Sequence, residues 1–132
     1  MIIHLAACPG EADFMQELLE PNVIGVYHLM ESARKQDVDR IVMTSSCQVN
    51  QGTNWTERMI TIDEPPVPKG HYAVTKLMAE TGSRHYVQKH GTSIIVVRPG
   101  ACVTAVQAPP HEVTAGTGRS SAVPTSAPLH CV

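Results

Sequence analysis

Three short apolar runs alternate with two longer amphipathic segments along the chain. The runs lie at 2–7, 41–44 and 94–97, and their β-branched residues favour strands. Between them, 23–35 and 72–90 repeat apolar residues at the spacing of a helix. The order strand, helix, strand, helix, strand predicts an α/β fold whose strands pair in parallel through right-handed crossovers.

The first amphipathic segment carries the clearest helical pattern. Pro21 suits the first turn of this helix, and an earlier helical piece over 14–19 is expected to precede it. The predicted apolar face holds Val23, Val26, Tyr27, Met30 and Ala33, and the polar face holds His28, Glu31, Ser32 and Lys35.

The second helix is expected to run from Tyr72 to His90, with Gly91 in the C′ position that ends many helices. Its predicted apolar face holds Val74, Leu77, Met78 and Tyr86. The preceding residues, 47–70, show no clean period and contain several prolines and glycines. They predict a long loop, and loops of that length in compact domains are often functional.

Small and hydroxyl residues follow the ends of the first two predicted strands. Ala6 and Ala7 end the first run, which we expect to be a buried strand, and Ser45 and Ser46 follow the second. Open α/β sheets bind ligands at the carboxyl ends of their strands. The two alanines would let a flat ligand lie close, although packing at a strand end explains them equally well.

Charge and cysteine usage exclude several function classes. A formal charge of -2 and a pI near 6.4 give no basic surface for nucleic acid or for an acidic membrane. The four cysteines are scattered without metal-ligand spacing, which indicates reduced thiols rather than a zinc site or a disulfide framework. The apolar start is too short for a signal peptide or a membrane span, so we expect a cytoplasmic protein.

Composition changes after residue 102. Residues 103–132 are rich in Pro, Ala, Thr and Ser, carry few charges and show no period. Such a segment buries too little apolar surface to offset its ordering entropy, so we expect a disordered or loosely attached tail. The predicted domain therefore spans 1–102 and the tail spans 103–132.

Tyr72 and Lys76 form a Tyr-x-x-x-Lys motif at the start of the second predicted helix. One turn separates them, so a phenol and an ammonium share one face. A tyrosine with the ordinary pKa of about 10 is a poor base at neutral pH, but a neighbouring cation favours the phenolate and lowers that pKa. Tyr72 is thus a candidate proton-transfer group. The alternative is that Lys76 is a solvated helix residue and Tyr72 a packing residue.

Five segments carry a family resemblance. They are His4-Leu5-Ala6-Ala7, Asn22-Val23-Ile24-Gly25-Val26, Arg40-Ile41-Val42-Met43-Thr44-Ser45-Ser46, Tyr72-x-x-x-Lys76 and Arg98-Pro99. In this order they resemble the extended short-chain dehydrogenase/reductase superfamily, and more narrowly its NAD-dependent epimerase/dehydratase family. The resemblance covers residues 1–102. It implies a partial Rossmann-like, doubly wound parallel sheet of three strands and two main helices.

The resemblance also implies residue roles. Tyr72 would be the catalytic acid/base, Lys76 would hydrogen-bond the nicotinamide ribose, and Ser46 would orient the substrate hydroxyl or carbonyl. The implied cofactor is NAD, with NADP as the alternative, and the implied partner is a sugar or nucleotide-sugar, with no nucleic acid and no membrane. The implied cofactor-binding residues are Leu5, Ala6, Ala7, Asn22, Thr44, Ser45, Tyr72, Lys76, Arg98, Pro99 and Gly100.

The chain departs from the family pattern in two ways near Ser46. Asn50 stands where the family often has a tyrosine, which changes a contact on the substrate side. Cys47 and Gln48 replace the Asp-Glu pair that dehydratase members use in elimination, which disfavours dehydration. Epimerisation and simple dehydrogenation both stay open.

No glycine-rich phosphate-binding segment precedes His4. The resemblance begins at the family's fourth strand, so half of a six-stranded sheet and the substrate domain are expected to lie outside the matched part. A first strand without its neighbour leaves an edge and apolar surface uncovered, which favours a homo-oligomer or aggregation. A second hypothesis is therefore a truncated non-catalytic product or an interaction module that does not bind NAD.

Overall fold

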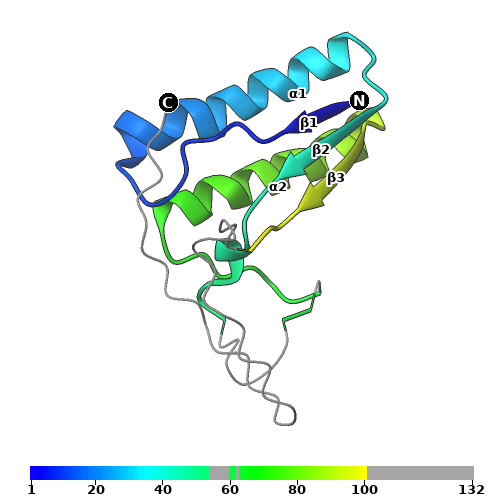
Figure 1. The fold of residues 1–132 in the computed structure, drawn as a ribbon. Helices are drawn as coiled ribbons and strands as arrows, with labels where there is room; N and C mark the ends of the chain where they lie inside the picture. Colours follow the sequence, from blue (N-terminus) through cyan, green and yellow to red (C-terminus); the bar gives the residue numbers. More distant parts are fainter. Residues whose placement is uncertain (54–59, 62, 101–132) are drawn as a thin grey trace, which may run out of the picture.

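The computed structural model describes residues 1–53, 60–61 and 63–100. These residues form a three-stranded parallel sheet and two long helices (Figure 1). The strands are β1 (Ile2–His4), β2 (Arg40–Thr44) and β3 (Ser93–Val97), and the helices are α1 (Gly25–Lys35) and α2 (His71–His90). The predicted α/β class and parallel pairing are confirmed, whereas the predicted tail at 103–132 lies outside the described residues.

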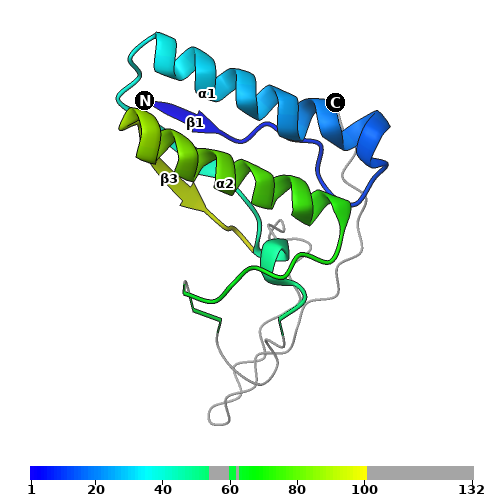
Figure 2. The same cartoon turned by 180° about the vertical axis from the view of Figure 1, so that it is seen from behind.

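The strands lie in the order β1-β2-β3, so β2 pairs with both of the others. Ile41 pairs with Ile2 of β1 and with Ile94 of β3. Both helices lie on the same side of this sheet, as the view from behind shows (Figure 2). The buried core between helices and sheet consists of Val26, Met30, Ala33, Ile41, Met43, Ala79 and Tyr86.

In the described part of the chain, no helix covers the opposite side of the sheet. Successive residues of a strand point to opposite faces, so the row next to the core row faces away from the helices. We call the residues Ile3, Val42, Ile95 and Val97 the open face; Ile3 is 58% exposed, Ile95 49% and Val97 44%. The prediction of a buried first strand is therefore wrong, because β1 is covered on one side and forms an edge of the described sheet.

Two π-helical turns, η1 (Phe14–Leu18) and η2 (Glu20–Ile24), lead into α1. The side chain of Asp13 begins η1 by accepting hydrogen bonds from the N–H groups of Met15 and Gln16. The earlier helical piece is confirmed, and Pro21 lies in the first turn of η2. On α1, Val26, Met30 and Ala33 are buried as predicted, but Tyr27 is 55% exposed because it lies about 100° around the helix from Val26.

The buried face of α2 is made mostly of small and polar residues. It consists of Ala73, Thr75, Lys76, Ala79, Glu80, Ser83 and Tyr86. The predicted apolar face is therefore wrong for Met78, which is 45% exposed. The helix ends at Gly91, whose φ of 70° is left-handed, as predicted.

Candidate active site

Tyr72 and Lys76 lie one turn apart at the start of α2. The Lys76 ammonium is 5.6 Å from the centre of the Tyr72 ring, and only 6% of the residue is exposed. Its Nζ donates a hydrogen bond to the Thr44 carbonyl at 3.1 Å. Lys76 thus joins α2 to the carboxyl end of β2, the edge where open α/β sheets bind ligands.

Ser46 reaches the same place from the segment after β2. It caps the short 3-10 helix η3 (Cys47–Asn50), and its Oγ accepts a hydrogen bond from the Gln48 N–H at 3.2 Å. Its hydroxyl lies close enough to the Tyr72 side chain for hydrogen bonding to act on the pKa of the phenol. The structure therefore brings together Ser46, Tyr72 and Lys76, the three residues predicted as catalytic.

Burial controls the protonation of this group. Burial raises the pKa of Tyr72 above its ordinary value, and hydrogen bonding with Ser46 acts in the opposite direction with less effect. Burial likewise lowers the pKa of Lys76. The sequence predicted that Lys76 would lower the pKa of Tyr72; in this structure the pKa of the phenol is raised, because Lys76 points to the Thr44 carbonyl while the ring is half-buried.

A partly buried ionic network lies next to the catalytic candidates. Arg98 donates two hydrogen bonds of 2.8 and 2.6 Å to the Glu80 carboxylate, and its third nitrogen donates to Asn50 Oδ1 at 2.7 Å. Ser45 Oγ donates to Glu80 Oε1. Burial acts to raise the pKa of Glu80, but the hydrogen bonds from Arg98 and Ser45 outweigh it and the net pKa is below its ordinary value. The network fixes the ends of β2 and β3 against α2.

Sequence reasoning missed Glu80. Its signal was its spacing, because Tyr72, Lys76 and Glu80 follow one another at intervals of four on one face of α2. Ser45 and Arg98 were predicted to contact the cofactor, and the structure commits both side chains to Glu80. The side-chain nitrogen of Asn50 is buried without a hydrogen-bond partner among the described residues.

Asn22 ties three segments together below the site. Its side chain accepts a hydrogen bond from the Cys8 N–H at 2.8 Å and donates to the Cys8 carbonyl at 3.0 Å and to Thr75 Oγ1 at 3.2 Å. Only 2% of Asn22 is exposed. Both the oxygen and the nitrogen of its amide are used within the chain. The predicted role of Asn22 near a cofactor would therefore be to hold Cys8 and Thr75 in position.

The end of the first strand opens onto a separate pocket. A pocket of about 430 Å³ is lined by His4, Ala6, Ala7, Pro21, Gly25, His28, Leu29 and Ser32. None of the three catalytic candidates lines it. His4 lines this pocket and also senses the charge of Lys76: burial lowers the pKa of His4, and the Lys76 charge lowers it further. The His4 Nε2 is buried without a partner among the described residues.

The segment after β3 runs beside η3. The Ser45 N–H donates to the Val97 carbonyl at 2.8 Å, and the Cys47 N–H donates to the Pro99 carbonyl at 3.0 Å. The predicted cofactor segment from Arg98 to Gly100 therefore borders Ser46 directly. Leu5, by contrast, follows β1 on the other side of β2 and is 72% exposed.

The position of Lys76 suits the ribose end of a nicotinamide cofactor. An ammonium has three N–H donors, and among the described residues Lys76 uses one of them on the Thr44 carbonyl. The remaining donors can bind the hydroxyls of a ribose. In the described part of the chain, no group of three His, Cys, Asp or Glu side chains forms a metal site, and no helix there is long and apolar enough to cross a bilayer.

The model of the NAD dependent epimerase/dehydratase family matches residues 1–125. The chain belongs to this family. The match continues beyond residue 102, the predicted end of the resemblance. The NAD dependent epimerase/dehydratase family thus accounts for the predicted motifs and the parallel sheet.

Two curated members are similar in sequence. Uronate dehydrogenase of Agrobacterium fabrum is 38% identical over 101 residues, which are 76% of this chain and 37% of that protein. L-arabinose 1-dehydrogenase (NAD(P)(+)) of Haloferax volcanii is 28% identical over 116 residues, which are 80% of this chain and 46% of that protein. The chain therefore spans less than half the length of these relatives.

Solved structures of family members superpose on the described fold. A mutant uronate dehydrogenase from Agrobacterium tumefaciens complexed with NAD gives a TM-score of 0.71 at 33% identity, covering 76% of this chain and 37% of that one. MoeE5 in complex with UDP-glucose and NAD gives a TM-score of 0.61 at 33% identity, covering 71% and 31%. These neighbours are NAD complexes of sugar and nucleotide-sugar enzymes.

Proposed function

We propose that this chain carries the catalytic residues of an NAD-dependent sugar dehydrogenase or epimerase, which moves a hydride between a sugar carbon and NAD. The observation that carries the proposal is the convergence of Ser46, Tyr72 and Lys76 at the carboxyl end of β2. The similarity to uronate dehydrogenase and to NAD-bound sugar enzymes supports this substrate class. NADP is the alternative cofactor.

Each residue of the group has a distinct task. Tyr72 exchanges a proton with the reacting sugar hydroxyl, and Ser46 orients that hydroxyl or the carbonyl formed from it. A phenol kept protonated by burial is a competent acid for reducing a carbonyl, and hydrogen bonding with Ser46 favours the phenolate needed for oxidation. Bound NAD would supply the hydride acceptor.

The cofactor contacts are proposed for the segments that border this group. Ala6 and Ala7, with Leu5, would face it from the end of β1, and Arg98, Pro99 and Gly100 from the end of β3. Thr44 would contribute through its backbone carbonyl, which holds Lys76, and Ser45 would contribute through its backbone. Asn22 would act by holding the Cys8 backbone in place.

Replacing Tyr72 tests the proposal. In an enzyme containing this chain, Tyr72→Phe should reduce turnover of a hexuronic acid, an aldose or a UDP-sugar by about 10²- to 10⁴-fold, the usual contribution of acid–base catalysis, while NAD affinity changes little. Tyr27→Phe, at an exposed position, is the matched control. Unchanged turnover after Tyr72→Phe would sink the assignment. Net formation of NADH marks a dehydrogenase, whereas sugar interconversion without it marks an epimerase.

A second candidate function is a non-catalytic interaction module that does not bind NAD. The open face and the edge strand β1 favour it, because uncovered apolar surface is typical of interaction sites. Calorimetric titration of this chain with NAD separates the two functions. Micromolar binding contradicts the interaction module, and the absence of any heat of binding contradicts an NAD site assembled by this chain alone.

A further inference from the structure

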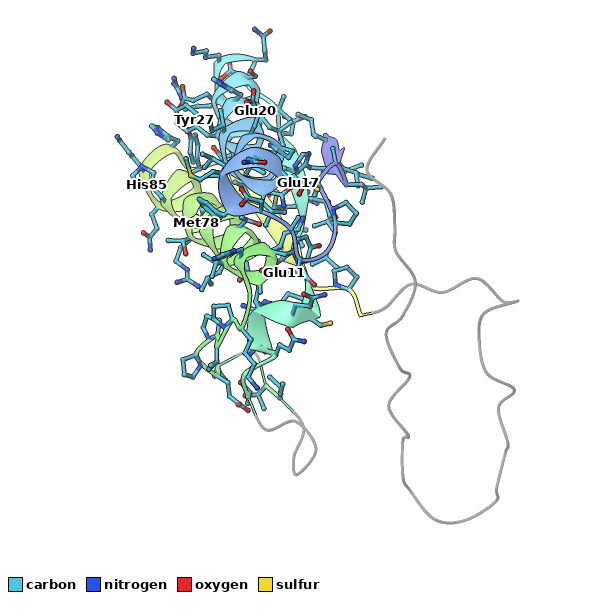
Figure 3. All side chains as sticks on the ribbon, turned by 90° about the vertical axis from the view of Figure 1, so that its left-hand side faces the viewer. Glu11, Glu17, Glu20, Tyr27, Met78 and His85 are labelled. Carbon is cyan, nitrogen blue, oxygen red and sulfur yellow. The ribbon has the colours of Figure 1, made fainter. Side chains whose placement is uncertain are left out.

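The helix that carries Tyr72 is capped from a distant segment. Its first N–H groups have no partners within the helix, and the N-cap residue, Gly70, has no side chain to offer. Glu11 supplies the cap: its Oε1 accepts from the His71 N–H at 2.8 Å, and its Oε2 accepts from the Tyr72 N–H at 3.2 Å. Figure 3 labels Glu11 at this end of α2. A carboxylate is favoured there by the partial positive charge of the helix terminus.

Gly70 makes room for this carboxylate. A Cβ at position 70 would lie 2.3 Å from Glu11 Oε2, so any side chain there would displace the cap. The backbone of Gly70 is extended, with φ of -146°, which other residues also adopt. The lack of a side chain at position 70, rather than backbone freedom, is therefore what the contact requires.

The loop from Cys8 to Glu11 is also linked to the backbone carbonyl of Tyr72. Thr75 Oγ1 donates to the Tyr72 carbonyl at 2.7 Å, and Asn22 donates to Thr75 Oγ1 while holding both backbone groups of Cys8. The loop from Cys8 to Glu11 thus reaches the N–H of Tyr72 through Glu11 and its carbonyl through Asn22 and Thr75. Both links converge on the residue that carries the reacting phenol.

We propose that Glu11 is a positioning residue, which fixes the first turn of α2 so that the Tyr72 phenol stays against Ser46. Its bearing on catalysis rests on the proposed function, but its effect on the phenol does not. The Glu11 side chain is 57% exposed, so its loss should loosen the first turn without unfolding the chain. The phenol then moves into water, and its raised pKa returns toward the ordinary value.

The test uses two readouts that need neither substrate nor cofactor. Amide exchange measures the protection of His71 and Tyr72, and the ring-carbon NMR signals of the chain's three tyrosines, assigned by Tyr→Phe replacement, report the titration of each phenol. Glu11→Ala should raise exchange at both amides by about five- to tenfold, as expected for loss of a cap, and shift the Tyr72 midpoint downward. Glu17→Ala removes an exposed carboxylate from η1 and should change neither.

Gly70→Ala separates position from charge. It keeps the Glu11 charge but displaces the carboxylate, so it should reproduce the faster exchange and the downward midpoint shift. Glu11→Gln keeps one acceptor and should protect the His71 amide better than Glu11→Ala does. The proposal is overturned if Glu11→Ala matches Glu17→Ala, or if Gly70→Ala leaves the Tyr72 midpoint at its wild-type value. Either failure would leave the proposed function untouched, because no turnover is measured.

Discussion

The three tyrosines show how surroundings decide what a phenol does. Tyr27 is 55% exposed on α1, whereas Tyr86 is buried and donates to Glu31 Oε1 at 2.7 Å. Burial and this hydrogen bond raise the pKa of Tyr86 to about 12. Tyr72 alone combines partial burial with a hydroxyl neighbour, Ser46, at the end of a strand. The environment of Tyr72, as well as its motif, therefore supports the proposed proton-transfer role.

The Tyr86–Glu31 bond gives a prediction at the residue scale. Tyr86→Phe should lower the free energy of unfolding near neutral pH by about 1 kcal/mol, the usual net value of a hydrogen bond. Because the folded pKa of Tyr86 is raised to about 12 from about 10, its contribution is complete below pH 10 and is lost as the pH rises toward 12. The gap between wild type and variant should therefore narrow over that range in urea unfolding.

Lowering the pH tests the same hydrogen bond from the side of Glu31. Hydrogen bonds from Arg34 and Tyr86 lower the pKa of Glu31 to about 2, so its contribution is complete above pH 4.5 and is lost as the pH falls toward 2. Tyr27→Phe is the control, since among the described residues the Tyr27 hydroxyl makes no hydrogen bond. An equal loss of stability in both variants would contradict the assignment.

Individual residues were predictable from sequence where spacing along one element decides them. The Tyr72–Lys76 pair follows from one helical turn, and the resemblance supplied Ser46. The Glu80–Arg98 bond joins α2 to the end of β3 and depends on how these elements pack, so no local pattern revealed it. The raised pKa of Tyr72 was missed for the same reason, because burial is a property of the packed molecule.

At the scale of elements, the site depends on loops that are fastened to α2 by side chains. Asn22 of η2 joins the backbone after β1 to Thr75 of α2, and Arg98 joins the end of β3 to Glu80 and to η3. Loss of one partner of a buried hydrogen bond leaves the other unsatisfied, which costs more than the net value of the bond. The geometry of the site is therefore set by a few polar residues between elements rather than by the apolar core.

Asn22 provides the prediction at this scale. Asn22→Ala removes the two hydrogen bonds that its side chain makes with the Cys8 N–H and carbonyl, so it should lower the free energy of unfolding by about 2 to 3 kcal/mol and increase exchange of the Cys8 amide. Gln16→Ala, at an exposed position of η1, is the matched control. Urea unfolding measures both variants. A cost for Asn22→Ala no larger than that for Gln16→Ala would show that solvent replaces these bonds.

For the whole molecule, the order of strands and helices along the chain was predictable from the sequence, but which face of the sheet the helices cover was not. The alternation of runs gave three parallel strands and two helices in the right sequence. It also suggested buried strands, because parallel sheets are ordinarily covered on both faces. In the described residues both helices lie on one side of the sheet, and an apolar run carries no mark of which of its faces another segment covers.

The open face carries the prediction for the whole molecule. Contiguous exposed apolar residues on a sheet favour association, so the chain should form concentration-dependent oligomers. The double variant Ile95→Thr/Val97→Thr keeps β-branched residues in β3 while adding hydroxyls to the open face, so it should weaken association with little change in unfolding. Met78→Gln, on the exposed side of α2, is the control. Sedimentation velocity measures all three proteins; if Met78→Gln abolishes association and the double variant does not, the copies meet through the helices and not through the open face.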